Sequence, residues 1–298
     1  MLTLEYSGSN MLFVVGCPRS GTTWVQRLLA THPRIRTGQE SDVFDQYIGP
    51  QLRAWEQALN PAASGRGGVG LGCYFQDGEF RRLLKGYLLQ LLEPMVGTLQ
   101  PGELFLEKTP GHVLFVPEIR ALLPQARFVH VLRDARDTVA SLLGASRGWG
   151  RGWAPRRANQ AAGTWVNHVN AARQAQRTLP ARQFFEIRYE ALHTDGPRVL
   201  RKLVDWLGIA WTDADISAAL ERNNPSAARA GRGTPIPLGG EFANTVGSVV
   251  NEPDGFVRQA RAGSWRTDLT PLDKLNVWRI ARTTMAEAGY PWRAPWSP

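Results

Sequence analysis

The sequence is organised around residues 11–32, MLFVVGCPRSGTTWVQRLLATH. It opens with five consecutive apolar residues, the length expected of a strand buried on both faces. A turn bounded by Gly16 and Gly21 follows, and residues 22–31 then place apolar side chains three and four positions apart, which predicts a helix. This arrangement directs backbone N–H groups and the positive end of a helix dipole towards one point. It therefore predicts an anion site, to which Arg19 adds a guanidinium suited to phosphate or sulfate.

The turn has the glycine spacing of a Walker A loop but lacks its lysine. Gly16 and Gly21 are spaced as in G-x-x-x-x-G-K-[ST], yet Thr22 occupies the position where a nucleoside triphosphatase has lysine. Such an enzyme would also need an Asp for Mg²⁺ at the end of a strand, and the nearest candidate, Asp134, lies beside Arg133. A P-loop-type nucleotide kinase stays an alternative function, and an ordinary strand-to-helix turn stays the simplest alternative for the loop.

The composition is that of a globular protein that suits an anionic partner. The 298 residues are 43% hydrophobic and carry a formal charge of +9, from 35 Lys and Arg against 26 Asp and Glu. A chain of this size holds enough apolar residues for one large α/β domain, and the excess of positive charge favours an anionic ligand or surface. Its two cysteines, Cys17 and Cys73, are too few for a disulfide framework or a Cys-rich zinc site.

Strands and helices alternate along the rest of the chain. Further strands are expected at residues 34–37, 104–106, 127–132 and 184–187, and helices at 79–96, 113–123, 155–178, 197–207, 213–222 and 271–288, with another helix opening at 133–137. Alternation of this kind predicts a central parallel sheet flanked by helices on both faces. Because no linker or internal repeat interrupts it, we expect one P-loop-like α/β domain over residues 1–298.

Three segments with little helical or strand periodicity predict loops. Residues 61–72 are rich in glycine and are expected to form a mobile loop. Residues 223–256 are rich in Gly, Pro, Ser and Asn, and a loop of that length inside a compact domain is usually functional or disordered, so we expect a mobile lid. Residues 147–157, RGWGRGWAPRR, interleave Trp with Arg. They favour either a nucleic-acid-binding module or a lid over an acceptor site with Trp149 and Trp153 as its walls.

A second strand-to-helix junction adds another anion-binding pair. Arg133 falls at the C-terminal end of the strand predicted for residues 127–132, and Ser141 lies eight positions later, within the following helix. Ligands of open α/β sheets bind at the C-terminal ends of the strands, so Arg19 and Arg133 are expected to face the same crevice. The alternative is a surface cluster of solvated ion pairs.

These two motifs resemble the nucleotide-binding loops of sulfotransferases that use 3′-phosphoadenosine 5′-phosphosulfate (PAPS). Residues 19–24, RSGTTW, resemble the 5′-phosphosulfate loop of that family, and residues 133–137, RDARD, followed by Ser141 resemble its 3′-phosphate motif. The resemblance extends from residue 11 to about residue 265 and implies a PAPS-dependent sulfotransferase. The residues that it implies in PAPS binding are Arg19, Ser20, Gly21, Thr22, Thr23, Trp24, Arg133, Ser141, Tyr189 and Arg258.

Three of these positions lie outside the two motifs' phosphate-binding cores. Trp24 falls where the family stacks an aromatic ring on adenine, and Tyr189 falls where it places a nucleotide-contacting tyrosine. Arg258, with residues 263–266, resembles the C-terminal R-K-G-x-x-G-D-W-K segment that closes over the 3′-phosphate. Because several positions of that segment depart from the pattern, only Arg258 is carried over from it.

Sulfuryl transfer to a hydroxyl needs a base, cationic donors around the sulfuryl oxygens and stabilisation of the leaving phosphate. Arg19 and Lys108 suit the last two roles, and no metal is required. The resemblance leaves two candidates for the base. Glu40 lies in residues 32–41, whose pattern resembles that of the tyrosylprotein sulfotransferases, which use a Glu. His112 lies two positions later than the His base of cytosolic sulfotransferases. We favour Glu40 and retain His112 as the alternative.

The motifs leave the acceptor open among small hydroxylated metabolites, glycoconjugates and peptidyl tyrosine. Residues 1–10 have no cationic region and no apolar segment of signal-peptide length, and no apolar run is long enough to cross a bilayer. These features predict a cytoplasmic protein without stable membrane insertion. We therefore expect a small-molecule or glycoconjugate hydroxyl as the acceptor, and no nucleic-acid partner. Nothing in the sequence indicates the oligomeric state.

Overall fold

A five-stranded parallel sheet forms the centre of the protein. The computed structural model describes residues 7–60, 69–237, 253, 255–256 and 261–290. The strands are β1 (Met11–Gly16), β2 (Ile35–Thr37), β3 (Leu104–Glu107), β4 (Arg127–Leu132) and β5 (Phe184–Arg188), and their order across the sheet is β2-β3-β1-β4-β5. Each pair of neighbouring strands is parallel. The predicted α/β fold with a central parallel sheet is confirmed.

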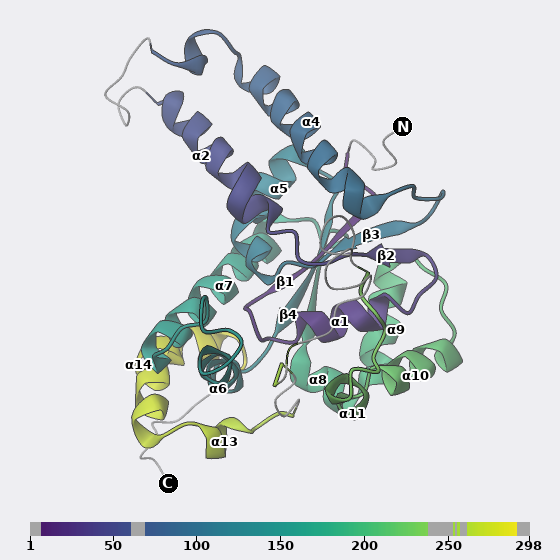
Figure 1. The fold of residues 1–298 in the computed structure, drawn as a ribbon, viewed down its shortest axis with the longest axis vertical. Coiled ribbons are helices and arrows are strands. Elements are labelled where there is room, and N and C mark those ends of the chain that lie inside the picture. Colours follow the sequence, from purple (N-terminus) through teal and green to yellow (C-terminus); the bar gives the residue numbers. More distant parts are fainter. Residues whose placement is uncertain (1–6, 61–68, 238–252, 254, 257–260, 291–298) are drawn as a thin grey trace.

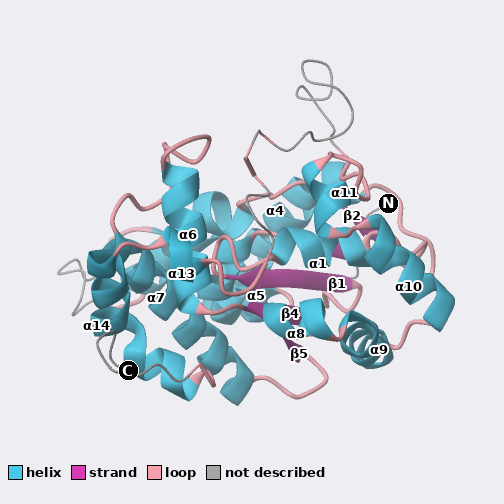
Figure 2. Cartoon of the chain, turned by 90° about the horizontal axis from the view of Figure 1, so that it is seen from below, coloured by secondary structure: helices cyan, strands magenta, loops and turns pink. Residues whose placement is uncertain are grey.

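Helices connect the strands and cover both faces of the sheet (Figures 1 and 2). They are α1 (Thr22–Leu29), α2 (Gly49–Ala58), α4 (Asp77–Val96), α5 (Val116–Leu122), α6 (Ala135–Ser146), α7 (Ala158–Thr178), α8 (Tyr189–Thr194), α9 (Gly196–Leu207), α10 (Asp213–Arg222), α11 (Pro225–Arg229), α13 (Trp265–Asp268) and α14 (Pro271–Glu287). A π-helical segment η1 (Val43–Ile48) and two 3₁₀ segments, η2 (Leu71–Cys73) and η3 (Pro110–Phe115), complete them. Within the described ranges, none of these helices is both long and apolar enough to cross a membrane.

The side chains of β1 alternate between two hydrophobic cores. Met11, Phe13 and Val15 pack on the face covered by α2, α4, α5 and α7, whereas Leu12 and Val14 pack on the face covered by α1, α9 and α10. A third core joins α6, α7 and α14. Every residue of β1 is buried, so the strand and the start of the loop that follows it are held from both sides.

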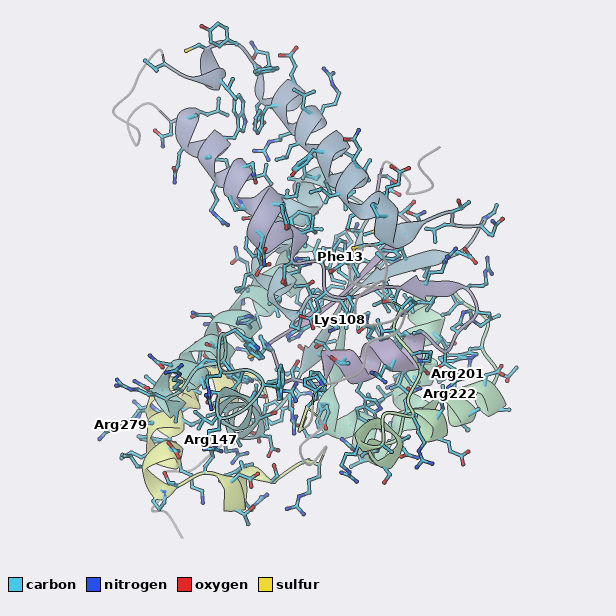
Figure 3. All side chains as sticks on the ribbon, viewed as in Figure 1. Phe13, Lys108, Arg147, Arg201, Arg222 and Arg279 are labelled. Atoms are coloured by element: carbon cyan, nitrogen blue, oxygen red, sulfur yellow. The ribbon has the colours of Figure 1, made fainter. Side chains whose placement is uncertain are left out.

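Helices α2 and α4 run side by side and project away from the sheet (Figure 1). The rings of Trp55 and Phe80 stack between them with centroids 4.2 Å apart, and Trp55 Nε1 donates to Asp77 Oδ1 over 2.8 Å. Figure 3 shows Phe13 and Lys108 near the centre of the molecule, away from this projecting pair. The catalytic candidates are therefore carried by the sheet and its adjoining loops.

Most predicted elements are found within one or two residues of their predicted bounds, and the differences are local. The helix predicted for residues 113–123 is divided into η3 and α5, with Pro117 in the first turn of α5. The loop predicted for residues 223–256 contains α11, because the Asn224 side chain accepts from the N–H of Ala227 over 2.8 Å and caps the helix. Residues 238–252 and 254 of that segment, and 61–68 of the other predicted loop, lie outside the described residues.

Candidate active site

The loop between β1 and α1 has a backbone suited to surrounding an anion. Gly21 has a φ of 106°, and a Cβ at this position would lie 2.5 Å from the ring of Tyr189, so a larger residue does not fit. Arg19 has a φ of 73°, which is uncommon for a residue with a side chain. Thr22 begins α1, whose N-terminal N–H groups are therefore directed at the same place.

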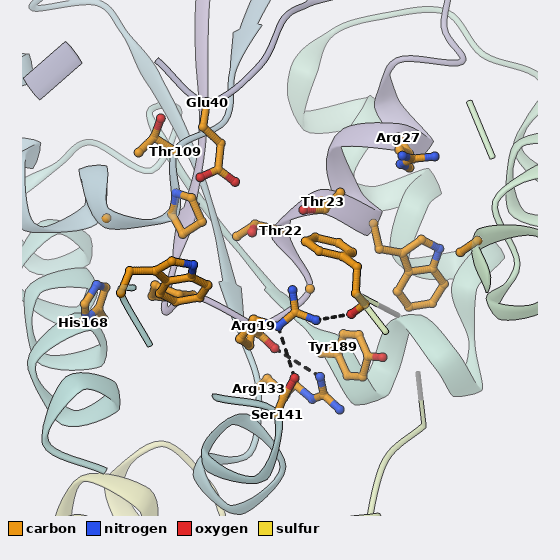
Figure 4. A pocket seen from close by; sticks show the side chains of 18 of the residues that line it. Arg19, Thr22, Thr23, Arg27, Glu40, Thr109, Arg133, Ser141, His168 and Tyr189 are labelled. Atoms are coloured by element: carbon orange, nitrogen blue, oxygen red, sulfur yellow. Dashed lines mark hydrogen bonds between the residues drawn. The ribbon is translucent and has the colours of Figure 1, made fainter. Parts of the chain in front are cut away.

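Arg19 packs against two aromatic rings that also contact each other, with centroids 5.0 Å apart. Its guanidinium lies 5.1 Å from the ring centroid of Trp149 and 4.4 Å from that of Phe256. Arg19 Nε donates to Ser141 Oγ over 3.2 Å, and an Nη donates to the carbonyl oxygen of Phe256 (Figure 4). Arg19 and Ser141, which the sequence assigned to separate motifs, are thus in direct contact, although Ser141 was predicted to pair with Arg133. Neither Phe256 nor its carbonyl was predicted as part of the site.

Arg133 ties the second motif to the first. Its Nη1 donates to the carbonyl oxygen of Arg19 over 3.1 Å, and its guanidinium lies 4.0 Å from the ring centroid of Tyr189. The Arg133 carbonyl in turn accepts from Trp165 Nε1 over 2.9 Å, which fixes the backbone at the end of β4. Burial raises the pKa of the Tyr189 hydroxyl although Arg133 opposes the shift, so the phenol is neutral at neutral pH. The predicted crevice is therefore formed, with both arginines on it.

The two motifs face a cavity of about 640 Å³. From the predicted set, the residues that line it are Arg19, Gly21, Thr22, Thr23, Trp24, Glu40, Arg133, Ser141 and Tyr189. Ser20, Lys108 and His112 do not line it, and Arg258 lies outside the described residues. Figure 4 shows Arg19, Arg133, Ser141 and Tyr189 gathered at one end, and Glu40 with Thr109 at the other.

Several buried polar atoms beside the cavity have no hydrogen-bond partner among the described residues. They are Ser20 Oγ, Trp24 Nε1, Arg133 Nε and His193 Nε2. The His193 ring packs against that of Trp24 with centroids 4.5 Å apart, and burial together with Arg133 lowers the pKa of His193. Because buried polar groups are normally satisfied, such a cluster at the end that holds both arginines fits a polar, anionic ligand.

Glu40 and Lys108 form an ion pair at the opposite end of the cavity. Lys108 Nζ donates to Glu40 Oε1. The Lys108 side chain is only 4% exposed, whereas that of Glu40 is 42% exposed and reaches the cavity. Lys108 itself does not line the cavity, but it contacts a carboxylate that does. The two residues are 68 positions apart, and the sequence alone did not predict that they meet.

His112 lies behind this pair and does not face the cavity. Its side chain is fully buried, and its Nδ1 lies 2.9 Å from Glu107 Oε2. Its Nε2 accepts from the N–H of Phe44 over 3.3 Å. Burial lowers the pKa of His112, but the nearby Glu107 and Asp45 outweigh it and raise that pKa overall. The position of His112 therefore does not suit the alternative base that the sequence suggested, because both ring nitrogens form contacts in the interior.

Two further carboxylates line the cavity beside Glu40, and sequence analysis did not identify them. Asp42 and Asp45 follow Glu40 in the segment 40–45, ESDVFD. Burial raises the pKa of both, and the charge of Glu40 raises that of Asp42 further. The sequence signal that could have pointed to them was their closeness to Glu40.

Asp137, the last residue of the RDARD motif, anchors the C-terminal segment. It is 1% exposed and accepts from the N–H groups of Gly263 and Trp265 over 2.7 and 2.9 Å. The Ser264 hydroxyl also donates to it over 3.3 Å. In this segment, the resemblance to the family had assigned a role in PAPS binding only to Arg258. Ser264, which departs from the family pattern, nevertheless lines the cavity.

Trp149 and Trp153 both line the cavity, and their ring centroids lie 5.5 Å apart. The expectation that they wall an acceptor site stays a prediction. Among the described residues, no group of three or more His, Cys, Asp or Glu side chains is placed to hold a metal ion.

A parallel α/β sheet with a glycine-bounded phosphate loop after its central strand defines the class as a P-loop-like nucleotide-binding fold. Within that class the family is identified by sequence: residues 12–213 match the model of the sulfotransferase family. The chain belongs to the sulfotransferase family. This match covers both phosphate-binding motifs and the Glu40–Lys108 pair.

Relatives with curated descriptions are similar over about two thirds of the chain. A protein-tyrosine sulfotransferase of Drosophila melanogaster is 24% identical over 206 residues, which are 68% of this chain and 39% of the relative. The protein-tyrosine sulfotransferase 1 of Danio rerio is 26% identical over 216 residues, which are 68% of this chain and 54% of the relative. The chain thus spans about half, or less, of the length of these relatives.

Solved structures of sulfotransferases share the fold. The sulfotransferase domain of a Synechococcus olefin synthase superposes with a TM-score of 0.55 at 18% identity and covers 92% of this chain and 94% of that domain. A mouse sulfotransferase complexed with PAP superposes with a TM-score of 0.58 at 14% identity and covers 93% of this chain and 85% of that one. The likeness supports the overall arrangement of sheet and helices described above.

Proposed function

We propose that the protein transfers the sulfuryl group of PAPS to an acceptor hydroxyl. The observation that carries this proposal is the division of one cavity into two ends. One end gathers Arg19, Arg133, Ser141 and unpartnered buried donors, as an anionic nucleotide requires. The other end presents Glu40 with Lys108 beside it. A nucleotide bound at the first end would direct its sulfuryl group towards the second.

Each donor-site residue has a proposed contact. The N–H groups of Ser20 to Thr23 and the Arg19 guanidinium bind the 5′-phosphosulfate, and Arg133 with Ser141 binds the 3′-phosphate. Trp24 offers an indole face to the adenine, with His193 packed behind it. Tyr189 is held by Gly21 and Arg133 and forms the wall between these contacts. Arg258 remains a proposed 3′-phosphate ligand.

In the proposed reaction the acceptor oxygen attacks sulfur in line with the bond to the 5′-phosphate. The new O–S bond forms as that S–O bond breaks, and the electron pair remains on the departing phosphate. The acceptor proton passes to the Glu40 carboxylate. Arg19 stabilises the negative charge that develops on the sulfuryl and phosphate oxygens, and Lys108, which lies behind Glu40, adds positive charge at the acceptor end of the cavity.

We prefer Glu40 to His112 as the base because the Glu40 side chain is exposed to the cavity and that of His112 is not. Glu40 is 42% exposed on the cavity, where an acceptor hydroxyl can reach it. His112 is fully buried with both nitrogens engaged. A hydroxyl could reach His112 only if η1 and η3 separated.

For the acceptor we propose a small-molecule or glycoconjugate hydroxyl. A cavity of about 640 Å³ has the size of a pocket for one or two small ligands, and Trp149 and Trp153 offer flat apolar walls. Peptidyl tyrosine is the second candidate, because two relatives are named as protein-tyrosine sulfotransferases.

The donor site is tested by thermal unfolding with three ligands. Adenosine 3′,5′-bisphosphate (PAP) at saturating concentration should raise the Tm by several degrees, because a ligand at about 100 times its Kd stabilises the folded state by about 2.7 kcal/mol. ATP with Mg²⁺ and a single-stranded oligonucleotide should leave it nearly unchanged. A larger shift with ATP would favour the kinase alternative, and one with the oligonucleotide would favour a nucleic-acid-binding module.

A further inference from the structure

A buried carboxylate lies directly behind the proposed catalytic pair. Glu107, at the end of β3, has a fully buried side chain. Its Oε1 accepts from Ser41 Oγ over 2.8 Å and from Thr109 Oγ1 over 2.7 Å, and its Oε2 accepts from His112 Nδ1 over 2.9 Å. The N–H of Ser41 also points to Oε1, over 3.3 Å. One carboxylate therefore gathers donors from two separate segments of the chain.

The donors belong to the residues that flank the catalytic pair. Ser41 follows Glu40, and Thr109 follows Lys108. Thr109 Oγ1 also accepts from the N–H groups of Ser41 and Asp42, over 3.2 and 3.3 Å. Asp42 has a φ of 47°, an uncommon backbone conformation that these bonds hold in place. The segment after Glu40 is thus fastened to the segment after Lys108 through Glu107 and Thr109.

The charge of Glu107 is retained in the interior. Burial alone would raise its pKa, but His112, Thr109 and Ser41 more than offset this and lower the pKa to about 2. An ionised carboxylate without donors would be strongly destabilising at such a depth. When donors from both catalytic segments satisfy the carboxylate, it holds these two segments in a fixed position relative to each other.

We propose that Glu107 is a positioning residue that sets the distance and orientation between Glu40 and Lys108. This inference rests on the proposed role of Glu40 as the base. Glu107 touches neither the cavity nor the reacting atoms, and it acts through Ser41 and Thr109. A displacement of about 1 Å in catalytic groups can lower the rate about 100-fold, so a network of this kind has a measurable effect on turnover.

The test compares two carboxylate–histidine pairs on different strands of the same sheet, of which the Glu107 carboxylate is fully buried and the Glu186 carboxylate is 25% exposed. Glu107→Gln places an amide, with one acceptor oxygen and an NH₂ donor, among several donors. Glu186→Gln is the matched control, because Glu186 Oε2 lies 3.2 Å from His130 Nδ1 and does not line the cavity. For each variant, kcat, KM for PAPS, the Kd of PAP and the Tm are measured, with the acceptor that gives transfer by the wild-type protein. The two substitutions are then repeated in Glu40→Gln.

Glu107→Gln should lower kcat about 10- to 100-fold while the Kd of PAP changes less than about twofold. Glu186→Gln should leave kcat nearly unchanged, even if it lowers the Tm as much as Glu107→Gln does. In the Glu40→Gln background, Glu107→Gln should cause a smaller loss than in the wild-type protein, since part of its effect on kcat passes through Glu40. If Glu107→Gln lowers kcat no more than Glu186→Gln does while Glu40→Gln is inactive, the positioning role is overturned and the base assignment stands. If Glu40→Gln is fully active, the base assignment itself fails and the positioning role with it.

Should Glu107→Gln fail to fold, Ser41→Ala provides the same test with a smaller change. It removes one hydroxyl donor from Glu107 and leaves the buried charge paired with His112. The expected loss in kcat is about 2- to 10-fold, the equivalent of one neutral hydrogen bond, with PAP affinity unchanged. A variant with wild-type kcat would overturn the proposal.

Discussion

At the scale of single residues, the sequence shows which types of side chain form the site, but it does not show which of them contact one another. Arg19 and Arg133 were placed by their motifs at the ends of two strands, and the structure joins them through the carbonyl of Arg19. The pairing of Glu40 with Lys108 could not have been predicted, because it depends on β3 lying between β1 and β2. The packing of Arg19 against Trp149 and Phe256 depends on loops with no periodic signal.

The first residue-scale prediction concerns the nucleotide. Arg133→Ala should raise the Kd of PAP tenfold or more, because loss of a charge-assisted contact to phosphate costs about 1.5–3 kcal/mol. Isothermal titration calorimetry measures this directly. Arg201→Ala, which breaks an ion pair with Asp213 far from the cavity, is the control and should bind PAP normally. Equal affinities of the two variants would remove Arg133 from the donor site.

The second residue-scale prediction concerns turnover. Lys108→Ala should lower kcat by about 100-fold or more, by analogy with the removal of one oxyanion donor. The Kd of PAP should change much less, because the ammonium contacts Glu40 rather than the arginine-lined end. Steady-state kinetics with PAPS separate the two effects. A near-normal kcat with a raised KM for PAPS would make Lys108 a binding residue only.

At the scale of elements, the sequence predicted the strands and long helices because hydrophobic periodicity determines them. It missed α8, α11 and α13, which have four to six residues and too few turns for a periodic signal, and it also missed the ten-residue α2. It also missed how α6 holds the C-terminal segment through Asp137. That attachment joins residues 126 and 128 positions apart, and no local pattern reports it.

Asp137→Ala tests the importance of this attachment. The change removes an acceptor from the N–H groups of Gly263 and Trp265. We expect the Kd of PAP to rise about tenfold, since the segment forms part of the cavity wall through Ser264 and its ordering would have to accompany binding. Asp273→Ala, which removes the carboxylate of the capping box of α14, is the matched control. It should lower the Tm by a similar amount without changing PAP affinity, and a parallel loss of affinity in both variants would contradict a specific role for Asp137.

At the scale of the whole molecule, the Glu107–His112 pair should make folding stability depend on pH. The pKa of His112 is raised in the folded state, so its contribution is complete below the unfolded value of about 6.5 and is lost as pH rises through the folded value. The pKa of Glu107 is lowered to about 2, so its contribution is present above its unfolded value and is lost as pH falls towards about 2. The pair should stabilise the fold most between about pH 4.5 and 6.5.

Urea unfolding between pH 5.5 and 9 tests this dependence. The free energy of unfolding of the wild-type protein, relative to that of His112→Asn, should be largest at the acidic end of this range and should decline towards pH 9. The variant removes the titrating imidazole, and the difference between the two proteins cancels those titrating groups that do not interact with His112. A difference that is constant across the range would show that protonation of His112 is not linked to folding.

The most direct test of the whole account is the transfer of ³⁵S from labelled PAPS by wild-type protein and by Glu40→Gln. The acceptor panel contains small phenols and alcohols, oligosaccharides and tyrosine-containing peptides, and PAP affinity is measured for both proteins in parallel. We predict that the wild-type protein labels a small-molecule or glycoconjugate hydroxyl and that Glu40→Gln binds PAP equally but transfers about 10²–10⁴-fold more slowly. Transfer by Glu40→Gln at the wild-type rate, or a wild-type protein that does not bind PAP at all, would contradict the account.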